Sequence, residues 1–416
     1  MTTATAPAKG GIWKQTRTFE PAVRLLFLNQ LTINLGFYML MPYLAAHLAD
    51  GLGMAAWAVG LVLGARNLSQ QGMFLVGGAL ADRLGFKPLI VAGCALRTVG
   101  FGALAFAQSL PMLIAASLAT GLAGALFNPA VRACLAAEAG ERRVEAFALF
   151  NAYYQGGILL GPLVGVALTG VSFRLTCVVA AVLFAGLTVV QLRHLPVRRS
   201  AEAAAGDGGR TGRQFRTVLA NRLFWLFSLA MTGSYVLSFQ VYLALPLAAD
   251  GTAATTALFV VSALVALAGQ LRITAWCKAR LSRERCLVLG LALMGAAFLV
   301  PAALGRSLVG LLLCAAVLAV ANAVLYPYEM DTVVALSGGR WVATHYGLYN
   351  TVCGIGITLG NLGTGALLDV TGWSAAPWLV LCAVGLGCAA AVAALARGGR
   401  LAVRQPAEEE SPSRSA

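Results

Sequence analysis

The chain has 416 residues, of which 59% are apolar and only 11% are charged, and its formal net charge is +14. A soluble protein of this length could not bury so large an apolar fraction, so lipid is the expected solvent. The basic residues lie in short segments between apolar runs, a distribution that argues against nucleic-acid binding. The nine cysteines show no metal-ligand spacing, and most lie inside apolar runs, so we expect neither a disulfide nor a metal site.

Twelve apolar runs are long enough to cross a bilayer as helices, which predicts an all-α membrane protein. The runs lie at roughly 22–49, 56–80, 88–108, 110–136, 144–169, 174–192, 222–248, 253–277, 286–305, 307–335, 342–368 and 374–396. Very short turns, at Ser109 and Arg306, separate the third run from the fourth and the ninth from the tenth. The alternative is therefore that the number of membrane spans differs from twelve by one pair.

The charges between the runs predict the orientation of the chain. With both termini in the cytoplasm, the cytoplasmic segments receive nearly all the Lys and Arg, and the external segments receive only Arg174 and Arg306. Basic loops stay on the cytoplasmic side of a membrane. We therefore expect a multi-pass protein of a bacterial inner (plasma) membrane.

The two halves of the chain resemble each other. Asn151 in the fifth run recurs as Asn350 in the eleventh, and Pro129 in the fourth run recurs as Pro327 in the tenth. Such matches indicate a duplicated six-helix unit. The predicted organisation is an N-terminal six-helix bundle over 1–193, a flexible cytoplasmic linker over 194–221, a C-terminal six-helix bundle over 222–398 and a disordered cytoplasmic tail over 399–416.

The stretch between the second and third runs, Gly-Ala-Leu-Ala-Asp-Arg-Leu-Gly-Phe-Lys, predicts a hairpin whose charges face water. It resembles the signature loop between helices 2 and 3 of the major facilitator superfamily. The matching residues are Gly78, Asp82, Arg83, Gly85 and Lys87. The resemblance implies two bundles that rock about a central cavity lined by spans 1, 4, 7 and 10. It also implies that Asp82 switches conformation by resting against the N-terminal end of span eleven.

Span five carries glycines four residues apart, followed by a proline. The residues are Gly157, Gly161, Pro162 and Gly165. They resemble the antiporter motif of the drug–proton branch of the superfamily. Glycines on one helical face let a second helix approach closely, so ordinary helix packing is the alternative interpretation.

Charged residues inside spans are costly and therefore point to function. Glu329 and Asp331 lie near the inner end of span ten, and Arg132 lies at the matching depth of span four. We predict that Glu329 or Asp331 pairs with Arg132 across the cytoplasmic end of the cavity. Protonating the acid would release the pair and couple proton binding to gate opening. The alternative is that these residues anchor helix ends in the headgroup layer.

Polar side chains in apolar helices usually face the protein interior. The candidates for the lining of the substrate cavity are Tyr38, Arg66, Asn151, Gln240 and Tyr326. Arg66 and Arg97 are also candidates for binding the acidic group of a substrate. The alternative for Arg97 is a partner within its own half.

No phosphate-binding loop, nucleophile motif or histidine cluster occurs, so we expect neither an enzyme nor a cofactor. The predicted function is proton-coupled export of small amphiphilic compounds, such as drugs or secondary metabolites, by alternating access. Its partners would be the small-molecule substrate, protons and the lipid bilayer, and the protein would be a monomer. The alternatives are an uptake symporter or facilitator for a sugar or organic acid, and a receptor or scaffold that transports nothing.

Overall fold

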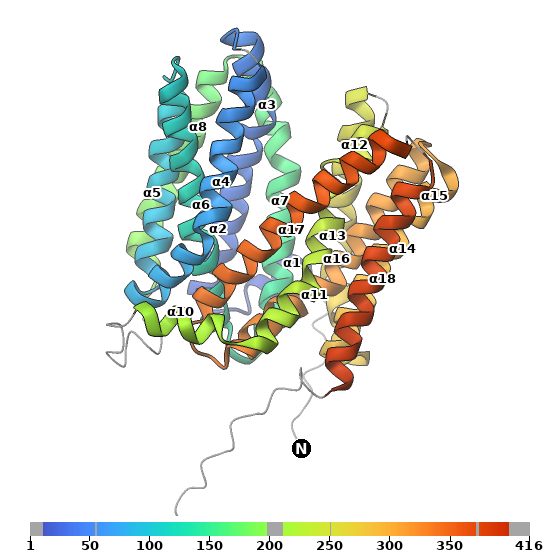
Figure 1. Cartoon of the computed structure of the whole chain (residues 1–416). Helices are drawn as coiled ribbons and strands as arrows, with labels where there is room; N and C mark the ends of the chain where they lie inside the picture. The colour runs from blue at the N-terminus through green and yellow to red at the C-terminus, as the bar shows by residue number, and fades with distance from the viewer. Residues whose placement is uncertain (1–10, 55, 198–210, 250, 372–373, 399–416) are drawn as a thin grey trace, which may run out of the picture.

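The computed structural model describes residues 11–54, 56–197, 211–249, 251–371 and 374–398, and every regular element in these ranges is helical (Figure 1). The first half contains α1 Ile12–Thr16, α2 Pro21–Tyr38, α3 Met41–Ala46, the π-helical turn His47–Gly51, α4 Ala56–Leu84, α5 Phe86–Leu104, α6 Leu110–Ala139, the 3₁₀ turn Gly140–Arg142, α7 Arg143–Thr169 and α8 Phe173–His194. The second half contains α10 Thr211–Leu219, α11 Arg222–Phe239, α12 Ala244–Ala248, α13 Gly251–Arg280, α14 Arg283–Ala297, α15 Leu299–Leu304, α16 Leu308–Ser337, α17 Val342–Thr371 and α18 Ala376–Arg397.

Three of the expected spans are each divided into two helices. The breaks separate α2 from α3, α11 from α12 and α14 from α15, and each second helix contains a proline. A proline ring clashes with the carbonyl four residues earlier. For Pro42 and Pro301 that carbonyl belongs to the last residue of the preceding helix, Tyr38 and Ala297. Pro129, by contrast, stays inside a continuous α6.

The membrane crossings agree with the expected twelve. Nine helical stretches among the described residues are long and apolar enough to span a bilayer, and one of them, Leu110–Thr169, contains both α6 and α7. The first crossing, α2 with α3, and the second, α4, are not among the nine. Arg66, Asn67 and Gln70 lower the mean hydropathy of α4. Adding these two crossings gives two sets of six among the described residues, which is consistent with the expected twelve.

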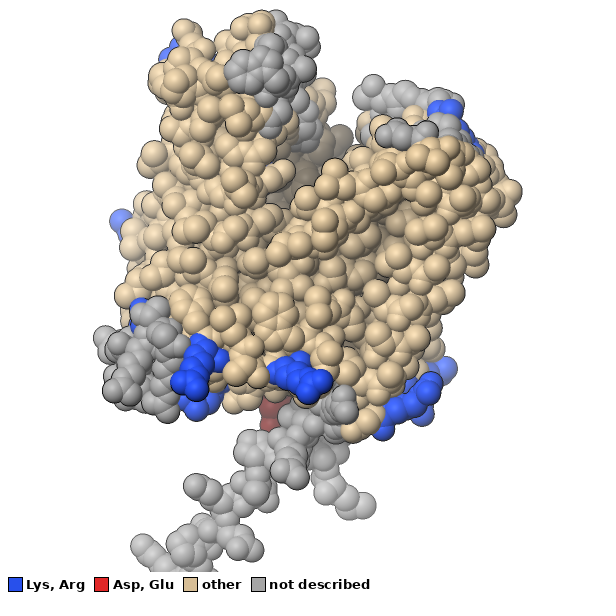
Figure 2. All heavy atoms as spheres, in the orientation of Figure 1, with Lys and Arg blue, Asp and Glu red and all other residues tan. Residues whose placement is uncertain are grey.

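The long helices form two bundles, α2–α8 and α11–α18, that lie side by side in Figure 1. The bundles meet mainly where α4 contacts α17 and where α7 contacts α13 and α16. Figure 2 shows the surface hollowed between the bundles at one end, with Lys and Arg gathered at the other. We call the latter the basic end. It carries the junctions α4–α5, α6–α7 and α13–α14.

Residues 211–219 correct the prediction of a flexible linker, because they form the helix α10. Its Gln214 and Val218 are fully buried, as expected for a surface helix with one face against the protein. Figure 1 shows α10 lying across the basic end of the first bundle. The linker residues 198–210 and the predicted tail at 399–416 lie outside the described residues.

The glycines of span five line a close contact between α7 and α2. A Cβ atom added to Gly157 would lie 2.6 Å from the Cβ of Asn34, and one added to Gly161 would lie 2.6 Å from the Cβ of Tyr38. On Gly165 the added atom would overlap the main-chain oxygen of Met39. The glycine spacing therefore allows α7 to pack closely against α2.

Replacing Gly161 with Ala should destabilise the protein by about 1–3 kcal/mol, because α2 must move to admit the methyl group. The matched control is Gly186→Ala on α8, where an added Cβ meets nothing within 4 Å. Size-exclusion profiles of heated detergent extracts check the prediction. A Gly161→Ala protein that survives heating as well as Gly186→Ala would contradict the packing role.

Candidate transport site and gate

A cavity of about 200 Å³ lies between the two bundles, lined by α2, α6 and α7 of the first and by α11, α13 and α16 of the second. Its aromatic lining residues are Tyr154, Tyr235, Phe239, Tyr242, Phe259 and Tyr326. Its charged lining residues are Arg132 and Glu329. Aromatic walls with a few fixed polar groups are typical of small-molecule sites.

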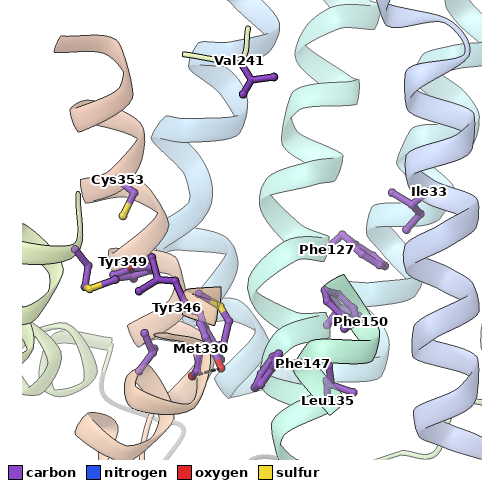
Figure 3. Close-up of a cluster of buried hydrophobic side chains, with 14 of the residues drawn as sticks. Ile33, Phe127, Leu135, Phe147, Phe150, Val241, Met330, Tyr346, Tyr349 and Cys353 are labelled. Carbon is purple, nitrogen blue, oxygen red and sulfur yellow. Dashed lines mark hydrogen bonds between the residues drawn. The ribbon is translucent and has the colours of Figure 1, made fainter. Parts of the chain in front are cut away.

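Glu329 lies on α16 and is only 2% exposed. The hydroxyl of Tyr349 on α17 donates a hydrogen bond to its Oε1. One turn earlier on α17, the hydroxyl of Tyr346 donates to the main-chain oxygen of Met330 at 2.9 Å. Figure 3 shows both tyrosines beside Met330. These bonds fix α16 against α17 and leave the second carboxylate oxygen of Glu329 for another partner.

Arg132 faces the cavity from the opposite bundle. Its Nη1 donates to Oδ1 of Asn350 on α17 at 3.2 Å, a bond that joins the two halves. Its Nε is buried and has no hydrogen-bond partner among the described residues. A guanidinium group carries five N–H donors, so Arg132 retains capacity for an acidic or carbonyl group.

The predicted ion pair between Arg132 and an acid of span ten is not among the ion pairs of the described residues, although Arg132 and Glu329 line the same cavity. Asp331 instead binds Nε of Arg143 at 3.0 Å and Nε of Arg283 at 3.2 Å. Glu329 is bound by Tyr349, and none of the ion pairs among the described residues joins it to Arg132. Residues two apart on a helix point about 200° apart, so the two acids cannot share one partner.

Several contacts close the gap between the bundles on the basic side of the cavity. Asp331 of α16 reaches Arg143 of α7, and Nζ of Lys278 lies 2.7 Å from Oε1 of Glu145. Closer to the cavity, Nδ2 of Asn151 donates to Oε1 of Gln270 at 2.8 Å. Phe147 and Tyr346 also meet across the gap, with ring centroids 6.4 Å apart (Figure 3). These contacts, which we call the candidate gate, close the basic side of the cavity, while Figure 2 shows the opposite end hollowed.

Asp82, at the end of α4, lies against the N-terminus of α17 in the other half. Its carboxylate accepts the main-chain N–H of Ala343 at 3.0 Å and that of Thr344 at 2.6 Å. The hydroxyl of Thr344 donates to the same carboxylate at 2.6 Å. Free N–H groups at a helix start carry partial positive charge, which favours this anion. The adjacent Gly78 permits the contact, because a Cβ there would overlap the main-chain oxygen of Ala343.

The remaining residues of the signature stretch shape the turn and bind the linker helix. Gly85 ends α4 with a φ of +92°, which a residue with a side chain rarely adopts. Lys87 lies half-buried in the first turn of α5. Nε of Arg83 donates to Oε1 of Gln214 on α10 at 3.1 Å. Nε2 of Gln214 in turn donates to the main-chain oxygen of Ala79 at 3.2 Å and to Oγ1 of Thr344 at 2.7 Å.

Gln214 is thus a bridge between the halves that the sequence analysis missed. The apolar spacing of Phe215 and Val218 around it indicates a helix, but the charged and glycine-rich residues before it pointed to a flexible linker. Burying an amide with all three bonds satisfied stabilises one arrangement of α4, α10 and α17.

Replacing Gln214 with Leu should loosen the closed gate by about 1–3 kcal/mol, because Thr344 and Arg83 each lose a buried partner. Limited trypsin digestion of the purified protein at the linker arginines checks this, with faster cleavage expected for the variant. Arg216→Gln on the same helix is the control and should leave the rate at the remaining sites unchanged. Equal rates for Gln214→Leu and wild type would contradict a bridging role.

Comparison with known proteins decides the family. The model of the Major Facilitator Superfamily matches residues 26–278. The chain belongs to the major facilitator superfamily. It is 53% identical over 369 residues to an uncharacterized MFS-type transporter of Mycobacterium tuberculosis, a match that covers 85% of this chain and 87% of that relative. It is 31% identical over 369 residues to the multidrug resistance protein MdtH of Klebsiella pneumoniae, which covers 86% of this chain and 90% of that protein.

Solved structures agree on the fold. The human organic anion transporter MFSD10 (TETRAN) matches with a TM-score of 0.71 and 18% sequence identity, covering 89% of this chain and 98% of that one. The peptide transporter POT matches with a TM-score of 0.67 and 18% identity, covering 94% and 99%. The chain therefore has the two-bundle major facilitator fold and is a multi-pass membrane transporter of a small-molecule substrate.

Of the residues predicted to line the cavity of this major facilitator structure, some line it and others do not. Asn151 and Tyr326 line it, and the hydroxyl of Tyr38 lies 3.4 Å from those of Tyr154 and Tyr242 at its edge. Gln240 and Arg66 are not among the residues that line this cavity. Gln240 is fully buried between α11 and α17, where it donates to Asn361 at 3.3 Å. A polar residue in a membrane helix marks the protein interior but not which interior surface it faces.

Arg66 and Arg97 lie inside the first bundle. Arg66 donates to Oδ1 of Asn67 and Oε1 of Gln70, each at 2.9 Å. Arg97 is 6% exposed and lies over the ring of Phe184, with Cζ 5.8 Å from the ring centroid. An arginine at the centre of a spanning helix costs about 2.5–3.5 kcal/mol on insertion scales. A cation–π contact returns only about 0.5–2 kcal/mol, so these two arginines are not explained by packing alone.

Proposed function

We propose that the protein exports small amphiphilic compounds, such as drugs or secondary metabolites, in exchange for protons. The observation that carries the proposal is the presence of two charged residues, Glu329 and Arg132, in a cavity otherwise lined by aromatic, apolar and uncharged polar side chains. The relatives named multidrug resistance protein MdtH support a drug-like substrate. In this proposal the basic end and both termini lie in the cytoplasm of a bacterium, since basic loops remain on that side of the inner membrane.

The charges of the cavity set the sign of the coupling. With Glu329 ionised, its carboxylate and Arg132 sum to zero, and with Glu329 protonated the cavity is left with one positive charge. A cationic amphiphile therefore binds better to the ionised form, and a proton expels it. The substrate and the proton therefore exclude each other from the cavity. A cavity that opens alternately to each side and holds only one of them at a time exchanges them across the membrane, which is antiport.

The conformation supports the step in which the substrate leaves. The gate contacts Asp331–Arg143 and Glu145–Lys278 are made, and Asp82 holds α17 at the basic end. In the proposal this is the outward-facing state, in which Glu329 takes up an external proton and the substrate departs. Release of the gate contacts then lets the protonated cavity face the cytoplasm.

A second candidate is uptake of an organic acid together with a proton. The buried Nε of Arg132, which has no hydrogen-bond partner among the described residues, favours a carboxylate ligand. Protonation of Glu329 would then raise the affinity for the anion instead of lowering it, and positive linkage of this kind gives symport. The direction of proton linkage therefore separates the two candidates.

Everted membrane vesicles, energised by respiration so that their lumen is acidic, test the proposal. An exporter should accumulate the lipophilic cation ethidium and partly collapse the pH gradient, which acridine orange fluorescence reports. A proton–anion symporter oriented for uptake should accumulate neither ethidium nor benzoate in these vesicles. Vesicles that lack the protein are the control, and a receptor or scaffold would behave as they do.

A further inference from the structure

A fully buried tyrosine connects the acid of the cavity to a second helix. The hydroxyl of Tyr349 on α17 donates a hydrogen bond to Oε1 of Glu329 on α16, and neither residue is more than 2% exposed. Glu329 is among the residues that line the cavity, whereas Tyr349 is not. Tyr349 therefore acts on a substrate in this cavity through the carboxyl group that it holds.

Two aromatic rings of α11 fix the position of the tyrosine. The ring of Phe227 stacks on that of Tyr349 with centroids 6.2 Å apart, and the ring of Tyr235 meets it edge-on at 5.9 Å. A buried ring packed in this way cannot swing aside without opening the protein interior. Figure 3 shows Tyr349 on α17 between Tyr346 and Cys353. The hydroxyl is therefore held at the carboxylate before a proton arrives.

Burial and the donated hydrogen bond act on the carboxyl group of Glu329 in opposite directions. Burial away from water disfavours an ionised carboxyl group, whereas a hydrogen bond donated by a hydroxyl stabilises the ionised form more than the protonated form. The proton that joins the carboxylate comes from water, and Tyr349 keeps its own proton while its bond to Oε1 weakens. A fixed donor at this oxygen therefore decides how readily the acid takes up and releases a proton.

We propose that Tyr349 is a positioning residue that sets the proton affinity of Glu329. For transport, the inference rests on the proposed function, because the proton affinity of Glu329 matters there only if this acid carries the coupled proton. The hydrogen bond itself does not depend on which substrate the cavity takes.

The other groups around Glu329 do not replace this control. The titratable side chains that face it are Arg132 of α6, Tyr235 of α11, Tyr326 of α16, and Tyr349 and Cys353 of α17. Arginine, tyrosine and cysteine side chains ordinarily keep their protons below pH 8. The arginines that α7 and α14 place against α16 bind Asp331 instead, and Lys278 of α13 binds Glu145. The short helices α12 and α15 carry no titratable side chain. Glu329 is therefore the group of this cluster whose charge changes as the pH falls below 8.

Infrared difference spectroscopy of the full-length protein in nanodiscs measures the protonation of Glu329 directly. The C=O band of a protonated carboxyl group that is missing in Glu329→Gln belongs to this residue, and its intensity is followed between pH 4.5 and pH 9. Tyr349→Phe removes a hydrogen bond that favours the ionised form, so the protonated form should persist to higher pH. We expect the pH of half-protonation to rise by about 1–2 units, the effect of one hydrogen bond to a charged acceptor.

Tyr346→Phe is the matched control. Tyr346 is equally buried on the same helix and also donates to α16, but its acceptor is the main-chain oxygen of Met330. Its variant loses the same kind of bond between the two helices and should leave the pH of half-protonation unchanged. If Tyr349→Phe does not fold, wild-type protein labelled with ¹³C-tyrosine replaces it, because a tyrosine C–O band should then shift at the same pH as the carboxyl band.

The possible results distinguish this inference from the proposed function. An unchanged pH of half-protonation in Tyr349→Phe, an equal shift in Tyr346→Phe, or tyrosine bands that do not follow the carboxyl band would each overturn the role of Tyr349 and leave export untouched. Vesicles that do not exchange ethidium for protons would remove export, yet a shift confined to Tyr349→Phe would still support the role of Tyr349. If wild type has no carboxyl band that Glu329→Gln lacks, Glu329 takes up no proton and both are overturned.

Discussion

Replacing Glu329 with Gln is expected to reduce the rate of proton-driven transport at least about 100-fold, while folded protein remains in the membrane. The amide has nearly the same shape as the carboxyl group, and its oxygen can still accept the hydrogen bond from Tyr349. It cannot take up a proton, so the cavity keeps the charge of Arg132 in every state. Substrate affinity should then be low for cations and independent of pH.

The measurement uses purified protein in liposomes with an imposed pH gradient and ethidium as the transported probe. Binding of the probe in detergent, measured between pH 5 and pH 8, gives the pH dependence separately. Glu20→Gln is the control, because Glu20 lies exposed before α2 and away from the cavity. Gradient-driven transport at the wild-type rate by Glu329→Gln would remove Glu329 from the coupling mechanism.

Most of the fold follows from composition and from the period of the apolar runs. Continuous apolar segments form helices in lipid. The breaks before Pro42 and Pro301 were not predicted, because a proline such as Pro129 also lies inside a continuous helix. The resemblance to the superfamily's signature loop implied that Asp82 rests against the start of span eleven, where the N-terminal end of a helix favours an anion. The position of a residue along its helix, and therefore its depth in the membrane, could thus be predicted from the sequence.

The side of the helix on which a residue lies could not be predicted from the sequence. Depth alone placed Glu329, Asp331 and Arg132 at one level, but the two acids face different sides of α16 and bind different partners. An amphipathic soluble helix reveals its buried face, whereas α16 is apolar on all sides. The same ambiguity assigned Gln240 to the cavity, although it faces Asn361.

Replacing Asp331 with Asn should shift the protein toward the state that is open at the basic end. Asp331 binds Arg143 of the first half and Arg283 of its own half, at 3.0 and 3.2 Å. Without the carboxylate, these two arginines face each other across the gap with no anion between them. The arginine side chains are 32% and 26% exposed, so we expect a loss of about 1.5–3 kcal/mol, less than for a fully buried pair. That loss favours the open state about tenfold to a hundredfold.

Spin labels on the exposed residues Glu141 and Arg280, one on each half at the basic end, report the opening as a distance distribution. The Asp331→Asn protein should gain a population at longer distances, and Glu284→Gln, at the start of α14, should not. High salt should produce less change in the variant than in wild type, because screening acts on an attraction that the variant has already lost. A distribution that matches wild type at every salt concentration would mean that Asn151–Gln270 and the contacts of Asp82 keep the gate closed without Asp331.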